Sequence, residues 1–141
     1  MADFSIKISD HSPEVLAALQ EQVEAALEAV GNQAVSHSKS IVTSESRVDT
    51  GALRNSISHA VSGDEKAVYV GTNQEYAIYN EYGTGIYLDG GGGRQSPWSY
   101  KDKRGKWHRT RGMRPIHFLR DAIAKHLDEY KQIIELYLRG G

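Results

Sequence analysis

Residues 68–85 read VYVGTNQEYAIYNEYGTG, and within this stretch the local pattern changes from strand to helix to loop. Residues 68–70 are β-branched or aromatic, which favours a half-buried strand. Three tyrosines then recur every third residue, the spacing of one side of a short helix. They are Tyr76, Tyr79 and Tyr82. Gly83 and Gly85 end the predicted helix and open a glycine-rich loop.

On the N-terminal side of this stretch, the pattern predicts a strand followed by a long helix. Apolar residues alternate with polar ones over residues 4–8, which predicts a strand with one buried face. Ser12 before Pro13 is a helix-start signal, and apolar residues three or four positions apart continue the helical pattern. We expect one helix over residues 13–45, with a kink at residues 31–32, where a glycine interrupts the pattern.

The segment just before residue 68 predicts a helical turn and a hairpin. Asp49 or Thr50 can cap a short turn in which Gly51 lets the backbone bend. Apolar residues four positions apart over residues 53–61 fit a helical turn that runs into a strand. After a polar turn, residues 67–72 return as the second strand of the hairpin.

On the C-terminal side, we expect an arm and a last helix. Residues 83–96 include four consecutive glycines and cannot specify a regular element. Residues 97–110 predict a hairpin with aromatic side chains on both strands, and a continuous apolar face predicts a helix over residues 116–138. The expected fold class is α+β, with an antiparallel sheet of four to five strands and two long helices packed against it. We expect a single domain over residues 1–141, with residues 83–112 as an extended loop and hairpin arm.

Composition narrows the class of protein. A chain of 141 residues can bury an ordinary core, and the absence of cysteine excludes disulfides and thiolate metal sites. No apolar run approaches the ~18 residues that a membrane-spanning helix needs. The N-terminus lacks a basic region followed by an apolar one, so we expect no signal peptide and a protein that stays in the cytosol where it is made.

The charges of the chain are unevenly distributed. Residues 94–120 contain nine Lys or Arg residues and one acidic residue, Asp102, which gives this segment +8. Because the whole chain carries −1, the remainder carries −1 − 8 = −9. This distribution suits contact with an anion or with an acidic surface of another copy of the chain.

Three phrases occur in order along the chain. They are DTGALRNSI at 49–57, YVGTN at 69–73 followed by YA at 76–77 and EYGTG at 81–85, and RPIHFLRDA at 114–122. In this order the chain resembles the head–tail joining, or tail-completion, family of long-tailed bacteriophages and prophages, over about residues 49–122 plus a helix on each side. The family's last phrase contains two prolines, of which this chain offers only Pro115. The residues that carry the resemblance are Asp49, Thr50, Gly51, Leu53, Arg54, Gly71, Gly83, Gly85, Pro115, Phe118 and Leu119.

The resemblance implies a structural role without catalysis, cofactor or metal. It implies a virion protein of the neck, assembled in the host cytoplasm as a homo-oligomeric ring, by family analogy a hexamer. The implied partners are the neighbouring head-connector and tail-tube proteins, with DNA passing through the lumen, and no membrane. The candidate residues for contacts with subunits or partners are Tyr76, Tyr79, Glu81, Tyr82, Thr84, Trp98, Tyr100, Lys103, Arg104, Trp107, Arg109 and Arg111.

Other interpretations of these residues stay open. The basic hairpin 97–110 is also suited to binding nucleic acid, because cationic side chains attract phosphates and aromatic rings stack on bases. Alternatively, it is a solvated hairpin with its rings packed on the sheet. Residues 81–85 fit either a partner-docking loop or a helix C-cap, and the tyrosines fit either an interface or half-buried core positions.

Enzymatic, nucleotide and metal sites have little support in the sequence. The glycine run has no following Gly-Lys-Ser/Thr, which argues against a nucleotide site. The six histidines lack metal-ligand spacing and cysteine partners, so we expect no zinc site. The sequence shows neither a nucleophile with a neighbouring base nor a pair of carboxylates, so it gives no indication of an enzyme.

Overall fold

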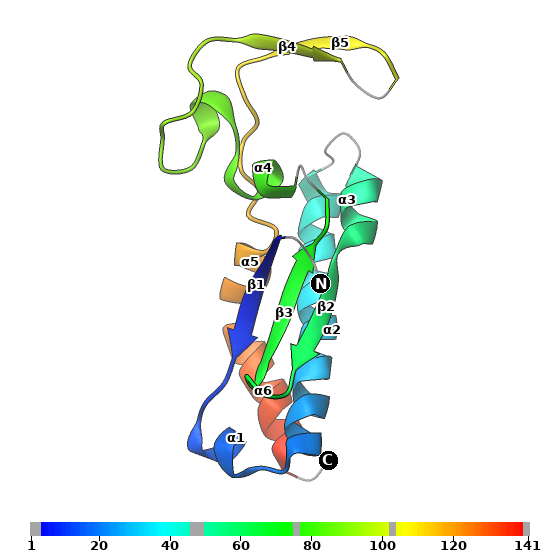
Figure 1. The fold of residues 1–141 in the computed structure, drawn as a ribbon, viewed down its shortest axis with the longest axis vertical. Helices are drawn as coiled ribbons and strands as arrows, with labels where there is room; N and C mark the ends of the chain where they lie inside the picture. Colours follow the sequence, from blue (N-terminus) through cyan, green and yellow to red (C-terminus); the bar gives the residue numbers. More distant parts are fainter. Residues whose placement is uncertain (1–3, 46–49, 75–76, 102–103, 140–141) are drawn as a thin grey trace.

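The computed structural model describes residues 4–45, 50–74, 77–101 and 104–139. Figure 1 shows an elongated body with a thin arm at one end. The elements are β1 (Phe4–Ser9), α1 (Pro13–Ala17), α2 (Gln20–Glu45), α3 (Thr50–Ser56), β2 (Ser58–Ser62), β3 (Ala67–Thr72), α4 (Ala77–Tyr82), the 3-10 helix η1 (Gly85–Tyr87), β4 (Trp98–Lys101), β5 (Trp107–Thr110), α5 (Arg120–Ala124) and α6 (Leu127–Leu138).

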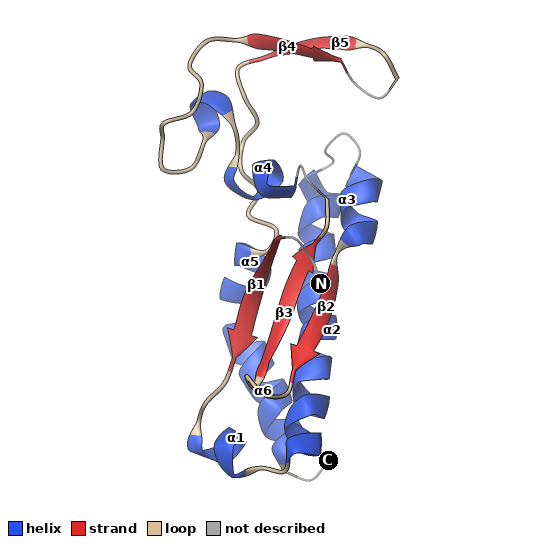
Figure 2. Cartoon of the chain, viewed as in Figure 1, coloured by secondary structure: helices blue, strands red, loops and turns tan. Residues whose placement is uncertain are grey.

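The body is a three-stranded antiparallel sheet covered on one face by helices. The strand order is β1-β3-β2, with Ile6 opposite Val70 and Val61 opposite Val68. The central strand β3 is almost wholly buried, as its β-branched sequence favours. Figure 2 shows α2 and α6 behind the sheet, and the core between these layers includes the fully buried Phe118. The α+β fold class is therefore confirmed.

The strands form two sheets rather than one. The sequence predicts one sheet of four to five strands. In the described part of the chain, however, β4 and β5 form a separate pair, with Trp98 opposite Thr110 and Lys101 opposite Trp107. Figure 1 shows this hairpin beyond the end of the body, at the tip of the arm. The two predicted hairpins are confirmed, and the predicted loop after Gly83 contains the short helix η1.

The expected single helix over residues 13–45 is wrong, because it is divided near its start. Ala18 has extended backbone angles (φ −77°, ψ 159°) and separates α1 from α2. The α2 helix continues through Gly31, where the sequence predicted the irregularity. At Gly31 an added Cβ would lie 2.5 Å from Cδ2 of His59 and 2.8 Å from Cγ2 of Val68. This glycine therefore lets α2 approach the sheet closely, which explains its presence inside a helix.

The last helix also differs from the expected range of 116–138. Helix α5 begins only at Arg120, because His117 has a left-handed conformation (φ 48°) that no α-helix accommodates. A second break at His126 (φ −130°, ψ 21°) separates α5 from α6. The apolar periodicity continues across both breaks, so it gave no sign of them. Among the described residues, no helix is long and apolar enough to cross a membrane.

Candidate assembly interface

The arm leaves the body through two segments that bind each other, residues 80–86 and 111–117, which we call the stem. The Thr84 N–H donates to the Met113 carbonyl (2.9 Å), and the Met113 N–H donates back to the Thr84 hydroxyl (2.9 Å). Two further backbone bonds flank this pair, from Ile86 to Arg111 (3.0 Å) and from Ile116 to Asn80 (2.8 Å). The stem therefore holds both ends of the arm in a defined place on the body.

Glycines in the stem are required by backbone conformation and by space. Gly83 is left-handed (φ 80°), and its N–H donates to the Tyr79 carbonyl (2.8 Å), so the predicted C-cap of α4 is confirmed. Gly85 is also left-handed (φ 61°), and a Cβ there would lie 2.0 Å from the Arg111 carbonyl oxygen. A side chain at Gly85 would therefore force the two stem segments apart.

The carboxylate of Glu81 connects the stem to the C-terminal helices. The side chain is fully buried, and its two oxygens accept the backbone N–H groups of Leu119 (2.8 Å) and Arg120 (3.1 Å). These N–H groups lie at the start of α5, where the helix dipole also favours a negative charge. Two of the phrases noted in the sequence, EYGTG and RPIHFLRDA, thus meet at one buried carboxylate. Because Glu81 is used inside the chain, we leave it out of the surface that contacts partners.

The hairpin β4–β5 presents aromatic and basic side chains to solvent. Trp107 is 66% exposed, and Tyr100 is exposed and stacks on His108 with ring centroids 5.2 Å apart. Trp98 is half-buried under the guanidinium of Arg94, 5.4 Å from the ring centroid. Figure 1 places the hairpin away from the three-stranded sheet. The exposed basic residues of the arm are Arg94, Lys101, Arg104, Lys106, Arg109 and Arg111.

Helix α4, at the base of the arm, carries an exposed apolar face. Ile78, Tyr79 and Tyr82 are all exposed, and their spacing of one, three and four residues places them on neighbouring parts of the helix surface. The ring of Tyr82 also meets Phe4 edge-on, with centroids 6.0 Å apart. The exposed face thus continues from the arm onto the body.

Acidic side chains gather at the end of the body opposite the arm. Glu21, Glu24 and Glu28 follow one another at three- and four-residue spacing on the first half of α2. The turn between β2 and β3, with Asp64 and Glu65, lies at the same end (Figure 1). Tyr69 donates a hydrogen bond to Glu65 (2.8 Å), which lowers the pKa of the Glu65 carboxyl.

The remaining sequence-predicted residues are divided between the core and the surface. Leu53, Phe118 and Leu119 are buried in the core, whereas Gly51 is exposed in α3. Thr84 is partly buried in the stem. Asp49, Tyr76, Lys103 and the side chain of Thr50 lie outside the described residues. Arg54 lies in α3, Gly71 in β3 and Pro115 in the stem.

Sequence reasoning did not find two groups of side chains that the fold brings together. One is the bond between Glu81 and the start of α5, whose partners are 38 and 39 residues away. The other is His37, His126 and Glu129, the group of described residues with three convergent metal-ligating atoms. The partners of Glu81 have no local spacing signal. In the second group His126 and Glu129 are three residues apart, which is a local signal, but His37 comes from a separate element and could not be assigned to them from the sequence.

Comparison with known proteins gave a match to a family of phage proteins. The family model described as "Bacteriophage HK97-gp10, putative tail-component" matches residues 2–83, which are 82 of the 141 residues. The match extends from β1 through α4 and ends where the arm begins. No curated protein and no solved structure matched the chain.

Proposed function

We propose a function on the premise that this chain belongs to the HK97-gp10-like family of bacteriophage tail components, whose model matches more than half of it. Membership makes the chain a structural protein of the phage tail and suggests a role without catalysis. Within that role, our proposal is a homo-oligomeric ring, six-fold by family analogy, at the head-proximal end of the tail. The ring joins the head connector to the tail tube and leaves a lumen for DNA.

The observation that carries this proposal is the separation of the basic, aromatic arm from the acidic end of the body (Figure 1). When the complementary surfaces of one chain lie at different places, copies associate head to tail, and such contacts form a closed ring if the rotation per subunit closes. Opposite charges on the two surfaces favour this orientation over the others and speed the encounter. The arm of one subunit therefore lies on the acidic end of its neighbour.

Trp107 is the side chain from which we expect the largest contribution to binding. It is a large ring that is 66% exposed in the isolated chain, and tryptophan and arginine dominate the binding energy of interfaces. Removing such a residue from the centre of an interface costs about 2 kcal/mol or more. A loss of about 2 kcal/mol corresponds to roughly 30-fold weaker association.

Sedimentation velocity of the purified full chain over a range of concentrations tests the proposal. We expect a discrete oligomer in the wild type and a shift toward monomer in Trp107→Ala. Leu127→Ala is the matched control, because Leu127 is 57% exposed and begins α6, where Glu129 reaches His37 in the second half of α2, away from Glu21, Glu24 and Glu28. Equal oligomerisation of Trp107→Ala and Leu127→Ala would contradict a contact through the arm.

Nucleic-acid binding by hairpin 97–110 is the second candidate, favoured by the exposed rings of Tyr100 and Trp107 next to basic side chains. A salt titration with short single-stranded and double-stranded DNA separates the two candidates. Binding that depends on phosphate contacts weakens steeply as salt rises. If the full chain does not bind DNA even at low salt, this second candidate is removed and the protein interface stands alone.

A further inference from the structure

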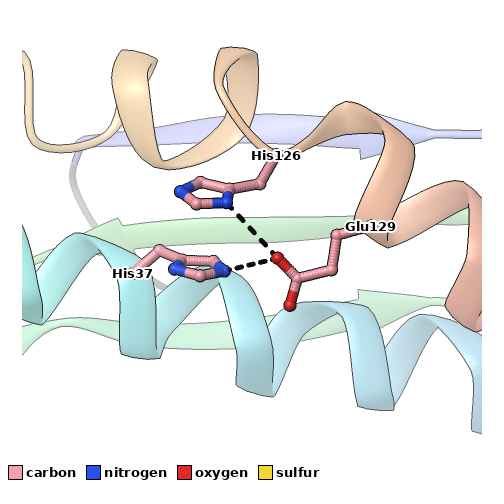
Figure 3. A group of neighbouring side chains, drawn as sticks. All are labelled: His37, His126 and Glu129. Carbon is pink, nitrogen blue, oxygen red and sulfur yellow. Dashed lines mark hydrogen bonds and ion pairs between the residues drawn. The ribbon is translucent and has the colours of Figure 1, made fainter.

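Three side chains with metal-ligating atoms meet where α2 packs against α6 (Figure 3). His37 comes from α2, His126 immediately precedes α6, and Glu129 lies in the first turn of α6. Oε2 of Glu129 is 2.8 Å from Nε2 of His37 and 3.3 Å from Nδ1 of His126. All three ligand atoms lie within 4.8 Å of one another.

We propose that this group is a binding site for a divalent transition-metal ion, with Zn²⁺ as the best-suited ion. Two imidazole nitrogens and one carboxylate are donors that zinc accepts, and three protein ligands leave a fourth position for water. At Zn–N and Zn–O distances of about 2.1 Å, two ligand atoms of a tetrahedral ion are roughly 3.4 Å apart. The two distances from Glu129 therefore need to lengthen by only about 0.6 Å or less.

The orientation of the two rings determines what binding requires. The imidazoles of His37 and His126 are stacked, with centroids 3.5 Å apart and planes 8° from parallel. In Figure 3 one nitrogen of each ring faces Glu129, namely Nε2 of His37 and Nδ1 of His126. A ligating lone pair lies in the plane of its ring, so one ion can meet both lone pairs only if the rings tilt out of the stack. His126 lies at the junction of α5 and α6, outside both helices, and its side chain is half-buried.

The side chains of Gln33 and Tyr130 border the group. Gln33 lies one turn before His37 on α2, and its Nε2 is 3.5 Å from Nε2 of His37. The buried ring of Tyr130 lies 6.2 Å from His37 and 6.4 Å from His126, centroid to centroid. Tyr130 is fixed by a hydrogen bond from its hydroxyl to the Ala122 carbonyl. The site therefore has an ordered wall on the core side and access to solvent through the half-buried histidines.

A bound ion would join two helices that are far apart in the sequence, since His37 and Glu129 are separated by 92 residues. An ion that binds the folded chain and not the unfolded one raises the unfolding temperature in proportion to the logarithm of its concentration, once that concentration exceeds the dissociation constant. This effect depends on the three ligands and not on the state of assembly of the chain. It can therefore be measured even if the ring proposal fails.

The test uses the full chain, freed of metal with a chelator that is then removed. We expect isothermal titration with Zn²⁺ to give one ion per chain and thermal unfolding to shift upward with added Zn²⁺. His37→Gln and His126→Gln should each weaken Zn²⁺ binding at least about tenfold, since mutation of residues that only hydrogen-bond to metal ligands already has effects of that size. His11→Gln is the control, because His11 is exposed and lies outside the group.

Two outcomes would overturn the proposal. One is a wild-type chain that binds Zn²⁺ no better than His37→Gln, and the other is an equal loss of binding in His11→Gln. Circular dichroism of each variant checks that it is folded. As a second measurement, Co²⁺ in place of Zn²⁺ should give the visible absorption of a tetrahedral ion in the wild type and in His11→Gln but not in His126→Gln.

Discussion

Replacing Gly31 by alanine tests the closest contact between α2 and the sheet. In an open helix position, glycine to alanine stabilises the folded state by about 1 kcal/mol, because alanine is the better helix former. At Gly31 the new Cβ would lie 2.5 Å from Cδ2 and 2.8 Å from Cγ of His59, and 2.8 Å from Cγ2 of Val68. These atoms belong to a ring that contacts Glu28 and to a fully buried valine, so they cannot move away easily.

The size of the expected effect follows from these two opposing terms. Overpacking of a well-packed core costs about 1–3 kcal/mol, and distances this short favour the upper part of that range. After subtraction of the helix-propensity gain, Gly31→Ala should destabilise the protein by about 1–2 kcal/mol. For a chain of this length, we expect the unfolding temperature to fall by roughly 3 °C per kcal/mol.

The matched control is the same substitution at Gly51, which lies in α3 with nothing within 4 Å of the position of a Cβ. Gly51→Ala should stabilise the protein by up to about 1 kcal/mol, so the two variants differ by about 2–3 kcal/mol. Urea unfolding followed by circular dichroism measures both. If Gly31→Ala is as stable as Gly51→Ala, α2 does not approach His59 and Val68 as closely as described, and the steric account of this glycine fails.

Three further predictions concern the stem, the acidic end and the arm. Glu81→Gln should lower the free energy of unfolding by about 1.5–3 kcal/mol and Glu81→Ala by more, since the buried Leu119 N–H and the partly buried Arg120 N–H lose their charged acceptor. Glu135→Gln, on the exposed side of α6, should change the free energy of unfolding little. Tyr69→Phe should return the pKa of Glu65 toward its ordinary value of 4.5 in an NMR titration. Because that pKa is lowered in the folded chain, the stability that the hydrogen bond contributes is present above about pH 4.5 and is lost as the pH falls. An unchanged pKa of Glu65 in Tyr69→Phe would refute the role of this hydrogen bond. Arg109→Glu on the arm and Glu24→Lys at the acidic end should each weaken assembly in sedimentation, whereas Lys131→Glu on α6 should not, and equal effects of all three reversals would contradict the charge pairing.

Elements with a local signal were predictable from the sequence. Alternating residues over 4–8 gave β1, and glycine at the end of the tyrosine-bearing helix gave the left-handed cap at Gly83. The basic hairpin was predictable because its aromatic strands flank a turn that ends in glycine. Each of these features depends on neighbours within a few residues, which a pattern can contain.

Features that depend on distant contacts were not predictable. The role of Gly31 is set by His59 and Val68, which belong to other elements, so the glycine looked like a kink. Apolar periodicity continues through the breaks at Ala18 and His126, because it reports which side is buried and not whether the backbone stays helical. The metal-ligating group and the Glu81 cap likewise form only once the chain is folded.

The mass of the purified chain in solution shows whether copies of this tail component associate, as we propose they do through their arms. Light scattering at micromolar and higher concentrations should give one discrete multiple of 15.6 kDa, six by family analogy, and the same measurement with the tail-tube protein present should give a larger complex. A mass of 15.6 kDa at every concentration, with and without the tail-tube protein, would show that the chain stays monomeric and would contradict the proposed ring.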